Sequence, residues 1–314
     1  MELEEVKRKI VGPAVPLITP LKPDYELDLD GLRTIARFAV DNGIVEGKAT
    51  LMAVTAAGEC PALTMEERKR AMEVVADEVG GKVPLITSAQ DCSLKNVIEL
   101  CKHAEKLGYD CIQISPPFYF DTSPAEVIRF FELINEATNI GVMVYNTTWL
   151  GVLGGKGIDT ELMGRLYQIG NIISVKWSSP NFYTYIDVLR NYADKMAFID
   201  NQYHGLGHLF GAKGFLAVIG GFYPKYVLRL WELYEARRYN EAIEELWKLQ
   251  IPLYQWFKDM AEQGINGEGA ILKPCFSMVG LPAGPARPPN DMELNEEQRS
   301  RLREILIKGG VPVV

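Results

Sequence analysis

Short apolar segments alternate along the chain with longer segments in which hydrophobic residues recur at helical spacing. The apolar segments, rich in β-branched residues, cover 11–19, 51–55, 83–89, 111–115, 141–146, 172–177, 196–200 and 215–220. The segments between them, such as 28–43, 64–80, 93–108 and 123–138, have the pattern of amphipathic helices. Several of these begin at Thr or Ser and end at Gly, as capped helices do. The alternation predicts parallel strands connected by helices.

Eight such units favour a closed (β/α)8 TIM barrel over an open sheet. The strands are almost continuously apolar, as expected when both faces are covered. The first strand-to-helix turn also lacks GxGxxG, the mark of a dinucleotide-binding open sheet. We therefore expect a barrel over residues 1–223. Residues 224–314 are expected to hold the last barrel helix and a C-terminal helical subdomain, with helices near 224–263, 266–280 and 294–308.

Composition narrows the class of protein further. The 314 residues are 47% hydrophobic, and the formal net charge of −8 comes without a basic stripe. This balance argues against nucleic acid or an anionic membrane as the partner. No apolar run approaches the roughly 18 residues of a membrane span, and the charged N-terminus does not resemble a secretory signal. Five scattered cysteines without a CxxC pair fit reduced thiols, so we expect a cytoplasmic protein.

Lys176 stands out because it ends an otherwise apolar strand segment. Active sites of such barrels lie at the C-terminal ends of the strands. A lysine there can reach solvent or a carboxylate, although no Asp or Glu occurs between residues 162 and 186. Alternatively, an amine in a dry setting has a lowered pKa and can attack a ketone to form a Schiff base. Position alone leaves both open. Tyr145, near the end of the preceding strand segment, is either a proton carrier or a hydrogen-bonded structural tyrosine.

Other motifs carry less chemistry. His204 and His208 have the i, i+4 spacing of two metal ligands, but no HExxH and no third ligand accompany them. The GGKG segment at 154–157 lacks the remaining residues of a P-loop, and no GxSxG is present. We expect neither a metal nor an organic cofactor.

Several ordered motifs resemble the dihydrodipicolinate synthase / N-acetylneuraminate lyase superfamily of class I aldolases, from about residue 10 to 290. They are TAAGE at 55–59 followed by LTMEER, SPPFYF at 115–120, YNTT at 145–148, SVKWSS at 174–179 and GAKGFLAVIGGFYP at 211–224. The resemblance implies that Lys176 forms the imine and that Tyr145 carries protons. It identifies Tyr119 with a tyrosine that crosses a dimer interface in some members, which implies a homo-oligomer, usually a tetramer built as a dimer of dimers.

The chain departs from this pattern where the family holds the substrate carboxylate and relays protons. The paired hydroxyl residues of the family fall on Ala56 and Ala57. Backbone N–H groups at Ala57 and Gly58 remain able to bind a carboxylate. We therefore expect carboxylate binding without the usual hydroxyls.

The positions that select the second substrate also differ. Leu150 stands where dihydrodipicolinate synthases carry an arginine, which disfavours lysine biosynthesis, and Asn201 and Gln202 stand where sialate lyases use acids. The resemblance places further substrate contacts at Trp149, Ser178 and Gly220. Aromatic residues are frequent near these motifs, namely Phe118, Trp149, Trp177, Phe182, Tyr183, Phe222 and Tyr223, and we expect about half of them to be structural packing.

The leading hypothesis is a Schiff-base lyase or aldolase, or a hydratase-aldolase, acting on pyruvate or on a partly apolar or aromatic 2-oxo acid. The ending GLPAGPARPP at 280–289 is similar to hydratase-aldolases that act on aromatic substrates. A sugar-acid aldolase or dehydratase of the 2-keto-3-deoxy type is the alternative within the same chemistry. A barrel that binds a carbonyl metabolite without turning it over is the alternative of another class.

Overall fold

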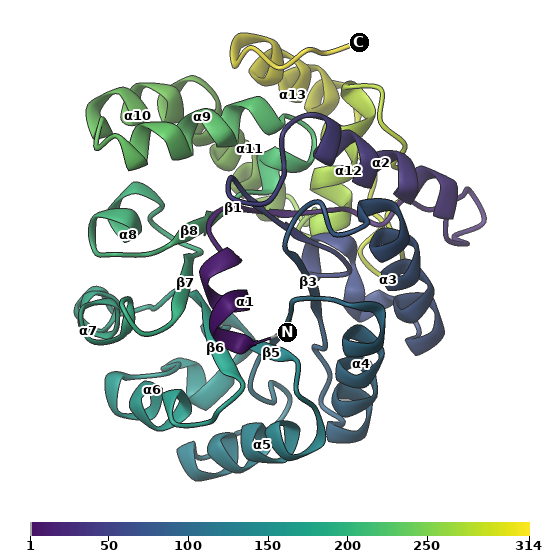
Figure 1. The fold of residues 1–314 in the computed structure, drawn as a ribbon. Helices are drawn as coiled ribbons and strands as arrows, with labels where there is room; N and C mark the ends of the chain where they lie inside the picture. The colour runs from purple at the N-terminus through teal and green to yellow at the C-terminus, as the bar shows by residue number, and fades with distance from the viewer. Residues whose placement is uncertain (1) are drawn as a thin grey trace. The chain divides into compact units, whose positions relative to one another are not determined.

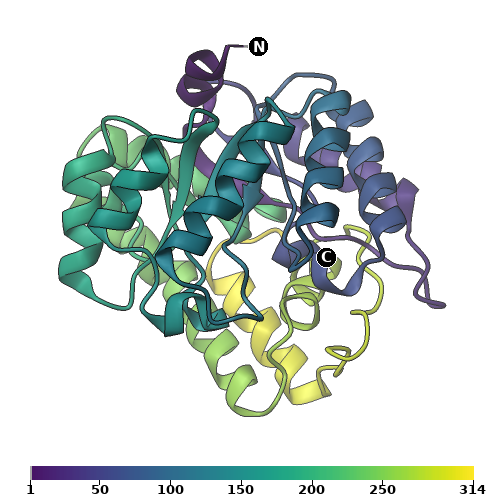
Figure 2. The same cartoon turned by 90° about the horizontal axis from the view of Figure 1, so that it is seen from below.

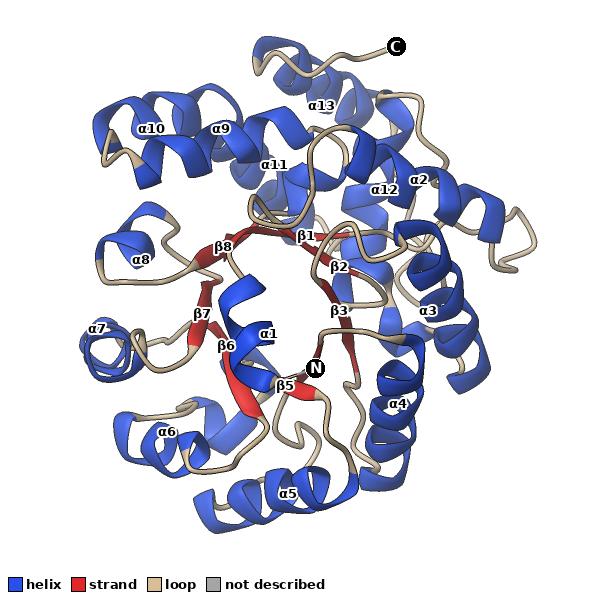
Figure 3. Ribbon diagram, viewed as in Figure 1, coloured by secondary structure: helices blue, strands red, loops and turns tan. Residues whose placement is uncertain are grey.

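Eight parallel strands close into a barrel in the order of the chain, from β1 to β8 (Figures 1 and 3). The structure is a computed structural model and describes residues 2–314. The strands are β1 (Gly12–Pro16), β2 (Thr50–Met52), β3 (Leu85–Ser88), β4 (Cys111–Ile114), β5 (Gly141–Tyr145), β6 (Ile172–Trp177), β7 (Ala197–Asp200) and β8 (Gly214–Leu216). β8 pairs with β1 to complete the ring. The predicted (β/α)8 barrel with additional C-terminal helices is confirmed.

The helices follow the strands as predicted. They are α2 (Leu29–Asp41), α3 (Met65–Val79), α4 (Leu94–Leu107), α5 (Pro124–Ala137), α6 (Thr160–Tyr167), α7 (Phe182–Tyr192) and α8 (Gly205–Leu209). The side chains of Thr64, Ser93 and Ser123 accept hydrogen bonds from the first turns of α3, α4 and α5, so the Thr and Ser signals in the sequence were correct. None of the helices of residues 2–314 is both long and apolar enough to cross a membrane.

The C-terminal helices are more divided than the sequence suggested. They are α9 (Pro224–Glu235), α10 (Tyr239–Glu245), a π-helix (Leu246–Gln250), α11 (Ile251–Glu262), α12 (Glu268–Met278) and α13 (Glu296–Lys308). The expected single helix over 224–263 is interrupted after Glu235, because Arg237 adopts a left-handed conformation with a φ of 55°. A left-handed residue ends a helix.

Two compact units divide the chain. The first comprises residues 1–14, 45–52 and 81–216, and the second comprises 15–44, 53–80 and 217–314. The predicted boundary between residues 223 and 224 stays a prediction. Lys176 and Tyr145 belong to the first unit, whereas the TAAGE segment belongs to the second.

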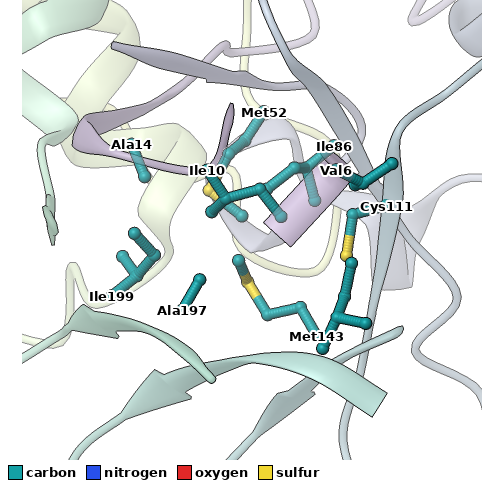
Figure 4. Packing of buried hydrophobic residues seen from close by; sticks show 10 residues of the cluster. Val6, Ile10, Ala14, Met52, Ile86, Cys111, Met143, Ala197 and Ile199 are labelled. Atoms are coloured by element: carbon teal, nitrogen blue, oxygen red, sulfur yellow. The ribbon is translucent and has the colours of Figure 1, made fainter. Parts of the chain in front are cut away.

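A short N-terminal helix, α1 (Leu3–Lys9), was missed in the sequence and covers one end of the barrel (Figures 1 and 2). Its Val6, together with Ile10, packs into a cluster of buried side chains in the barrel interior (Figure 4). The cluster includes Cys111 and Ala197, the first residues of their strands. α1 therefore covers the end where the strands begin, and the ends of β5 and β6 lie at the opposite side of the barrel.

Candidate active site

Lys176 and Tyr145 stand side by side at the ends of β6 and β5. The two residues are partners in the register of these strands. Only 4% of Lys176 is exposed, and its Nζ lies 4.0 Å from the centroid of the Tyr145 ring. A cation over a ring face gains about 0.5–2 kcal/mol. A protonated nitrogen at this position is therefore stabilised by a group that does not take its proton.

Two residues lock these strand ends together. The side-chain amide of Asn146 donates to the carbonyl of Ser178 at 2.7 Å, and the Ser178 hydroxyl donates to the carbonyl of Asn146 at 3.0 Å. The Asn146 side chain also accepts the N–H of Ile158 at 3.0 Å. The predicted substrate contact Ser178 is buried and its hydroxyl bonds to the neighbouring strand. This reciprocal pair holds Tyr145 and Lys176 in their relative positions.

The aromatic side chains divide into packed and exposed groups. Trp177 is fully buried and its indole N–H donates to the carbonyl of Tyr185 at 3.2 Å. Phe222 is likewise buried, against Phe276. Trp149, by contrast, is 57% exposed and meets the Tyr145 ring edge-on, with 5.6 Å between the ring centroids.

The remaining residues predicted to contact substrate or partner on this side of the barrel are open to solvent. Leu150 lies in the short 3₁₀ turn Thr148–Leu150 and is exposed, as are Phe182 and Tyr183 at the start of α7. Tyr119, in the loop between β4 and α5, is 83% exposed, and its ring forms a T-shaped pair with that of Phe120. These side chains are available to a ligand or to another copy of the chain.

An aspartate that sequence reasoning overlooked organises the loop after β7. The Asp200 carboxylate is buried and accepts the N–H groups of Gln202 at 2.9 Å and Tyr203 at 3.0 Å. Burial raises the pKa of Asp200 to about 6. The Gln202 side chain in turn accepts the N–H of Ser179 at 2.9 Å, and the Asn201 N–H donates to the carbonyl of Trp177. The two predicted amide residues thus connect the β6 and β7 loops.

The TAAGE segment folds into a 3₁₀ turn over Ala56–Gly58. The N–H of Gly58 donates to the carbonyl of Thr55 at 2.9 Å, so the turn itself uses this predicted carboxylate donor. The N–H groups of Ala56 and Ala57 stand at the start of the turn, where a helical turn has no acceptor of its own. Gly220 is another predicted contact. A Cβ at this position would lie 2.7 Å from the Val15 side chain, so close packing explains the glycine.

Two buried polar side chains were also missed. The Thr147 hydroxyl, two residues after Tyr145, is buried and makes no hydrogen bond within residues 2–314. In Gln113 of β4, both atoms of the side-chain amide are also buried and make no hydrogen bond within residues 2–314. Gln113 pairs with Met143 of the core cluster in the register of β4 and β5. Such groups bind water or a ligand in most proteins. The YNTT motif was the available signal for Thr147.

The two histidines with i, i+4 spacing lie at α8. His204 precedes α8 with a φ of 47°, packs on Phe215, and has a pKa lowered to about 4 by burial. Over the described residues 2–314, no three His, Cys, Asp or Glu side chains are grouped so as to hold a metal ion.

Comparisons with known proteins show similarity along nearly the whole chain. The model of the dihydrodipicolinate synthetase family matches residues 9–308. The 4-hydroxy-tetrahydrodipicolinate synthase of Methanocaldococcus jannaschii is 28% identical over 300 residues, which cover 95% of this chain and 97% of the relative. The N-acetylneuraminate lyase of Fusobacterium nucleatum is 29% identical over 274 residues, covering 87% and 90%. A crystal structure of a dihydrodipicolinate synthase superposes with a TM-score of 0.82 at 25% identity, over 96% of this chain and 99% of that one.

Proposed function

Because the chain belongs to the dihydrodipicolinate synthetase family, a family of class I lyases, we propose that Lys176 forms an imine with a 2-oxo acid and that the protein makes or breaks a bond next to that carbonyl. The observation that carries this proposal is the Lys176 amine, 4.0 Å from the Tyr145 ring at the paired ends of two barrel strands. Family membership supports the reaction class, and the geometry supports the choice of Lys176 and Tyr145.

The reaction proceeds through the nitrogen of Lys176. The neutral amine attacks the keto carbon, the carbinolamine loses water, and the resulting iminium withdraws electrons from the neighbouring carbon. The C–C or C–O bond next to it then breaks, or forms in the reverse direction, through an enamine. The face of the Tyr145 ring stabilises the positive iminium, and the Tyr145 hydroxyl moves protons in these steps.

The substrate carboxylate binds to the backbone of the Ala56–Gly58 turn in this proposal. The similarity of TAAGE to the family's GTTGE segment supports this assignment, and the N–H groups at the start of the turn provide donors. Because Ala56 and Ala57 have no hydroxyl, the turn contributes through its backbone. Proton transfer then falls to side chains elsewhere, of which Tyr145 and the buried hydroxyl of Thr147 are candidates.

The second part of the substrate is partly apolar or aromatic. Trp149, Leu150 and Phe182 expose 57%, 41% and 44% of their surfaces around the loops that follow β5 and β6. Asn201 and Gln202, neutral and bonded to the β6 loop, offer little to a polyhydroxylated sugar. We therefore favour an aryl or alkyl oxo acid over a 2-keto-3-deoxy sugar acid.

Borohydride trapping tests the imine directly. The protein is incubated with pyruvate or an aryl-substituted 2-oxo acid and reduced with borohydride. The mass of the intact chain is then measured by mass spectrometry. We expect one adduct in the wild type and none in Lys176→Met. Lys195→Met is the matched control, because Lys195 also lies over an aromatic ring, 5.0 Å from that of Tyr192, and should keep the adduct. Absence of an adduct in the wild type, or an adduct retained in Lys176→Met, would refute the proposal.

Substrate selectivity separates the remaining alternatives. We expect kcat/KM to be higher for aryl oxo acids than for polyhydroxylated ones, and Trp149→Ala to reduce this preference. The opposite ranking would select the sugar-acid alternative, and tight binding with an adduct but no turnover of any oxo acid would select the non-catalytic barrel.

Light scattering tests the predicted homotetramer, with Tyr119→Ala as the variant that should weaken it.

A further inference from the structure

Four charged side chains surround the end of the Ala56–Gly58 turn. Glu59 directly follows the turn, Glu67 lies in α3, Lys273 lies in α12, and Arg287 lies in the segment that follows α12. We refer to these four residues as the charged cluster. They all belong to the second compact unit of the chain.

The centre of the charged cluster is a buried ion pair. Nζ of Lys273 lies 2.5 Å from Oε2 of Glu59, and the two residues are 2% and 8% exposed. The same Nζ donates to the carbonyl of Pro285 at 2.6 Å. The ammonium is therefore held between a carboxylate and a carbonyl, which fixes the position of Glu59.

Arg287 closes the other side of the Glu59 carboxylate. Its backbone N–H donates to Oε1 of Glu59 at 2.8 Å, while its guanidinium contacts Oε2 of Glu67 at 2.7 Å and the carbonyl of Ala62 at 3.3 Å. Gly269 packs so closely that a Cβ there would lie 2.3 Å from Oε1 of Glu59. The carboxylate of Glu59 is thus held by neighbours on both oxygens.

The backbone at this point needs such support. Glu59 has a φ of 56° and a ψ of 31°, a left-handed conformation that residues with a side chain seldom adopt. The preceding residue is fixed as well, since the Thr19 hydroxyl donates to the carbonyl of Gly58 at 2.8 Å. The shape of the turn is therefore determined by contacts on both sides of Gly58.

We propose that the charged cluster positions the backbone N–H groups of Ala56 and Ala57 for the substrate carboxylate, with Glu59 and Lys273 as positioning residues. This inference rests on the proposed function. Where a turn carries hydroxyl side chains, these can adjust to a carboxylate by rotation. A turn with two alanines depends on its backbone geometry alone, so the residues that set this geometry determine the affinity for the acid.

The test compares a 2-oxo acid with its methyl ester, which lacks the carboxylate charge. The variants are Glu59→Gln/Lys273→Met, which removes both charges, and Gly269→Ala, which keeps both but displaces the Glu59 carboxylate. In each we expect KM for the acid to rise at least tenfold, kcat to change less than threefold, and kcat/KM for the ester to stay unchanged. Asp259→Asn, in the separate 2.7 Å Asp259–Arg301 pair, is the control and should match the wild type.

Other outcomes overturn the inference in distinct ways. An unchanged KM for the acid in either folded variant, or an equal loss of kcat/KM for acid and ester, excludes a positioning role. Circular dichroism identifies which variants are folded. If the double variant does not fold, Gly269→Ala decides the question. Borohydride trapping at saturating oxo acid is run in parallel. No adduct in the wild type refutes the proposed function, whereas an adduct in all proteins with unaltered KM refutes only the role of the charged cluster.

Discussion

Lys176 and Lys273 are both buried lysines, yet the side chains that lie beside them differ. Lys176 is 4% exposed and lies over an aromatic ring at the end of a strand. Lys273 is 2% exposed and lies within a helix, 2.5 Å from a carboxylate. A carboxylate binds the protons of an ammonium and favours its charged form, whereas a ring face stabilises positive charge without binding the proton tightly. Burial alone therefore does not distinguish the proposed nucleophile from a lysine held in an ion pair.

The two regions around these lysines differ in the same way. Near Lys176, the side chains of Asn146 and Ser178 bond the ends of β5 and β6 to each other. Around Lys273 the groups are charged in pairs and support a backbone turn. The first region holds the proposed nucleophile, and the second supports a backbone turn.

The largest effect should come from removing the amine of Lys176. Lys176→Met should reduce kcat/KM by at least about 10⁴-fold, as removal of a covalent nucleophile does, with no loss in the free energy of unfolding. Steady-state kinetics on the trapped oxo acid and urea unfolding measure the two quantities. A Lys176→Met protein with more than a tenth of wild-type activity would contradict the comparison.

Lys273→Met should instead lower the stability of the fold. Leaving the Glu59 carboxylate buried without its partner should cost about 3–5 kcal/mol in the free energy of unfolding. Glu59→Gln/Lys273→Met, in which no charge is left unpaired, should recover most of this loss. Urea unfolding of the three proteins checks both statements, and a double variant as unstable as the single one would show that the ion pair itself is the source of stability.

Much of this molecule was predictable from its sequence because its signals are local. The capping residues Thr64, Ser93 and Ser123 and the β-branched strand segments follow from periodicity and helix-end chemistry. The family motifs marked Lys176 and Tyr145, which the structure brings into register on neighbouring strands.

The features that were missed depend on contacts distant in sequence. The charged cluster joins Glu59 to Lys273 and Arg287, more than 200 residues away, and no spacing rule connects them. α1 was not predicted because most of its residues are charged. Its Val6 and the adjacent Ile10 nevertheless fill the barrel end. The use of the Gly58 N–H within its own turn also depends on backbone geometry that the motif did not reveal.

The contributions of Asp200 and Glu67 to the free energy of unfolding should depend on pH with opposite signs. The pKa of Asp200 is raised to about 6 by burial, so its contribution to stability is complete below pH 4 and is lost as pH rises through 6. The pKa of Glu67 is lowered by the hydrogen bond from Arg287, so its contribution is present above the usual pKa and is lost on acidification.

The measurement is urea unfolding at pH 4 and pH 6.5. The stability of wild type relative to Asp200→Asn should fall by up to about 3 kcal/mol over this interval, because one pKa unit corresponds to about 1.4 kcal/mol. Relative to Glu67→Gln it should rise. His204, whose pKa is lowered to about 4, opposes the Asp200 effect but is present in every protein compared. Equal pH responses of the two variants would contradict the assigned environments.

The smallest effect concerns the hydroxyl that the alanines of the turn do not provide. The hydroxyl of Thr147 is buried and makes no hydrogen bond to residues 2–314, two positions after Tyr145. If this hydroxyl relays protons, Thr147→Val should lower kcat about tenfold while KM stays constant. This loss is below the usual gain from acid–base catalysis, because Tyr145 still carries protons. Thr148→Val is the neighbouring control and should change kcat less than twofold. Thr147→Val with wild-type kcat would instead leave Tyr145 as the proton carrier, and the lysine region would work without a second hydroxyl.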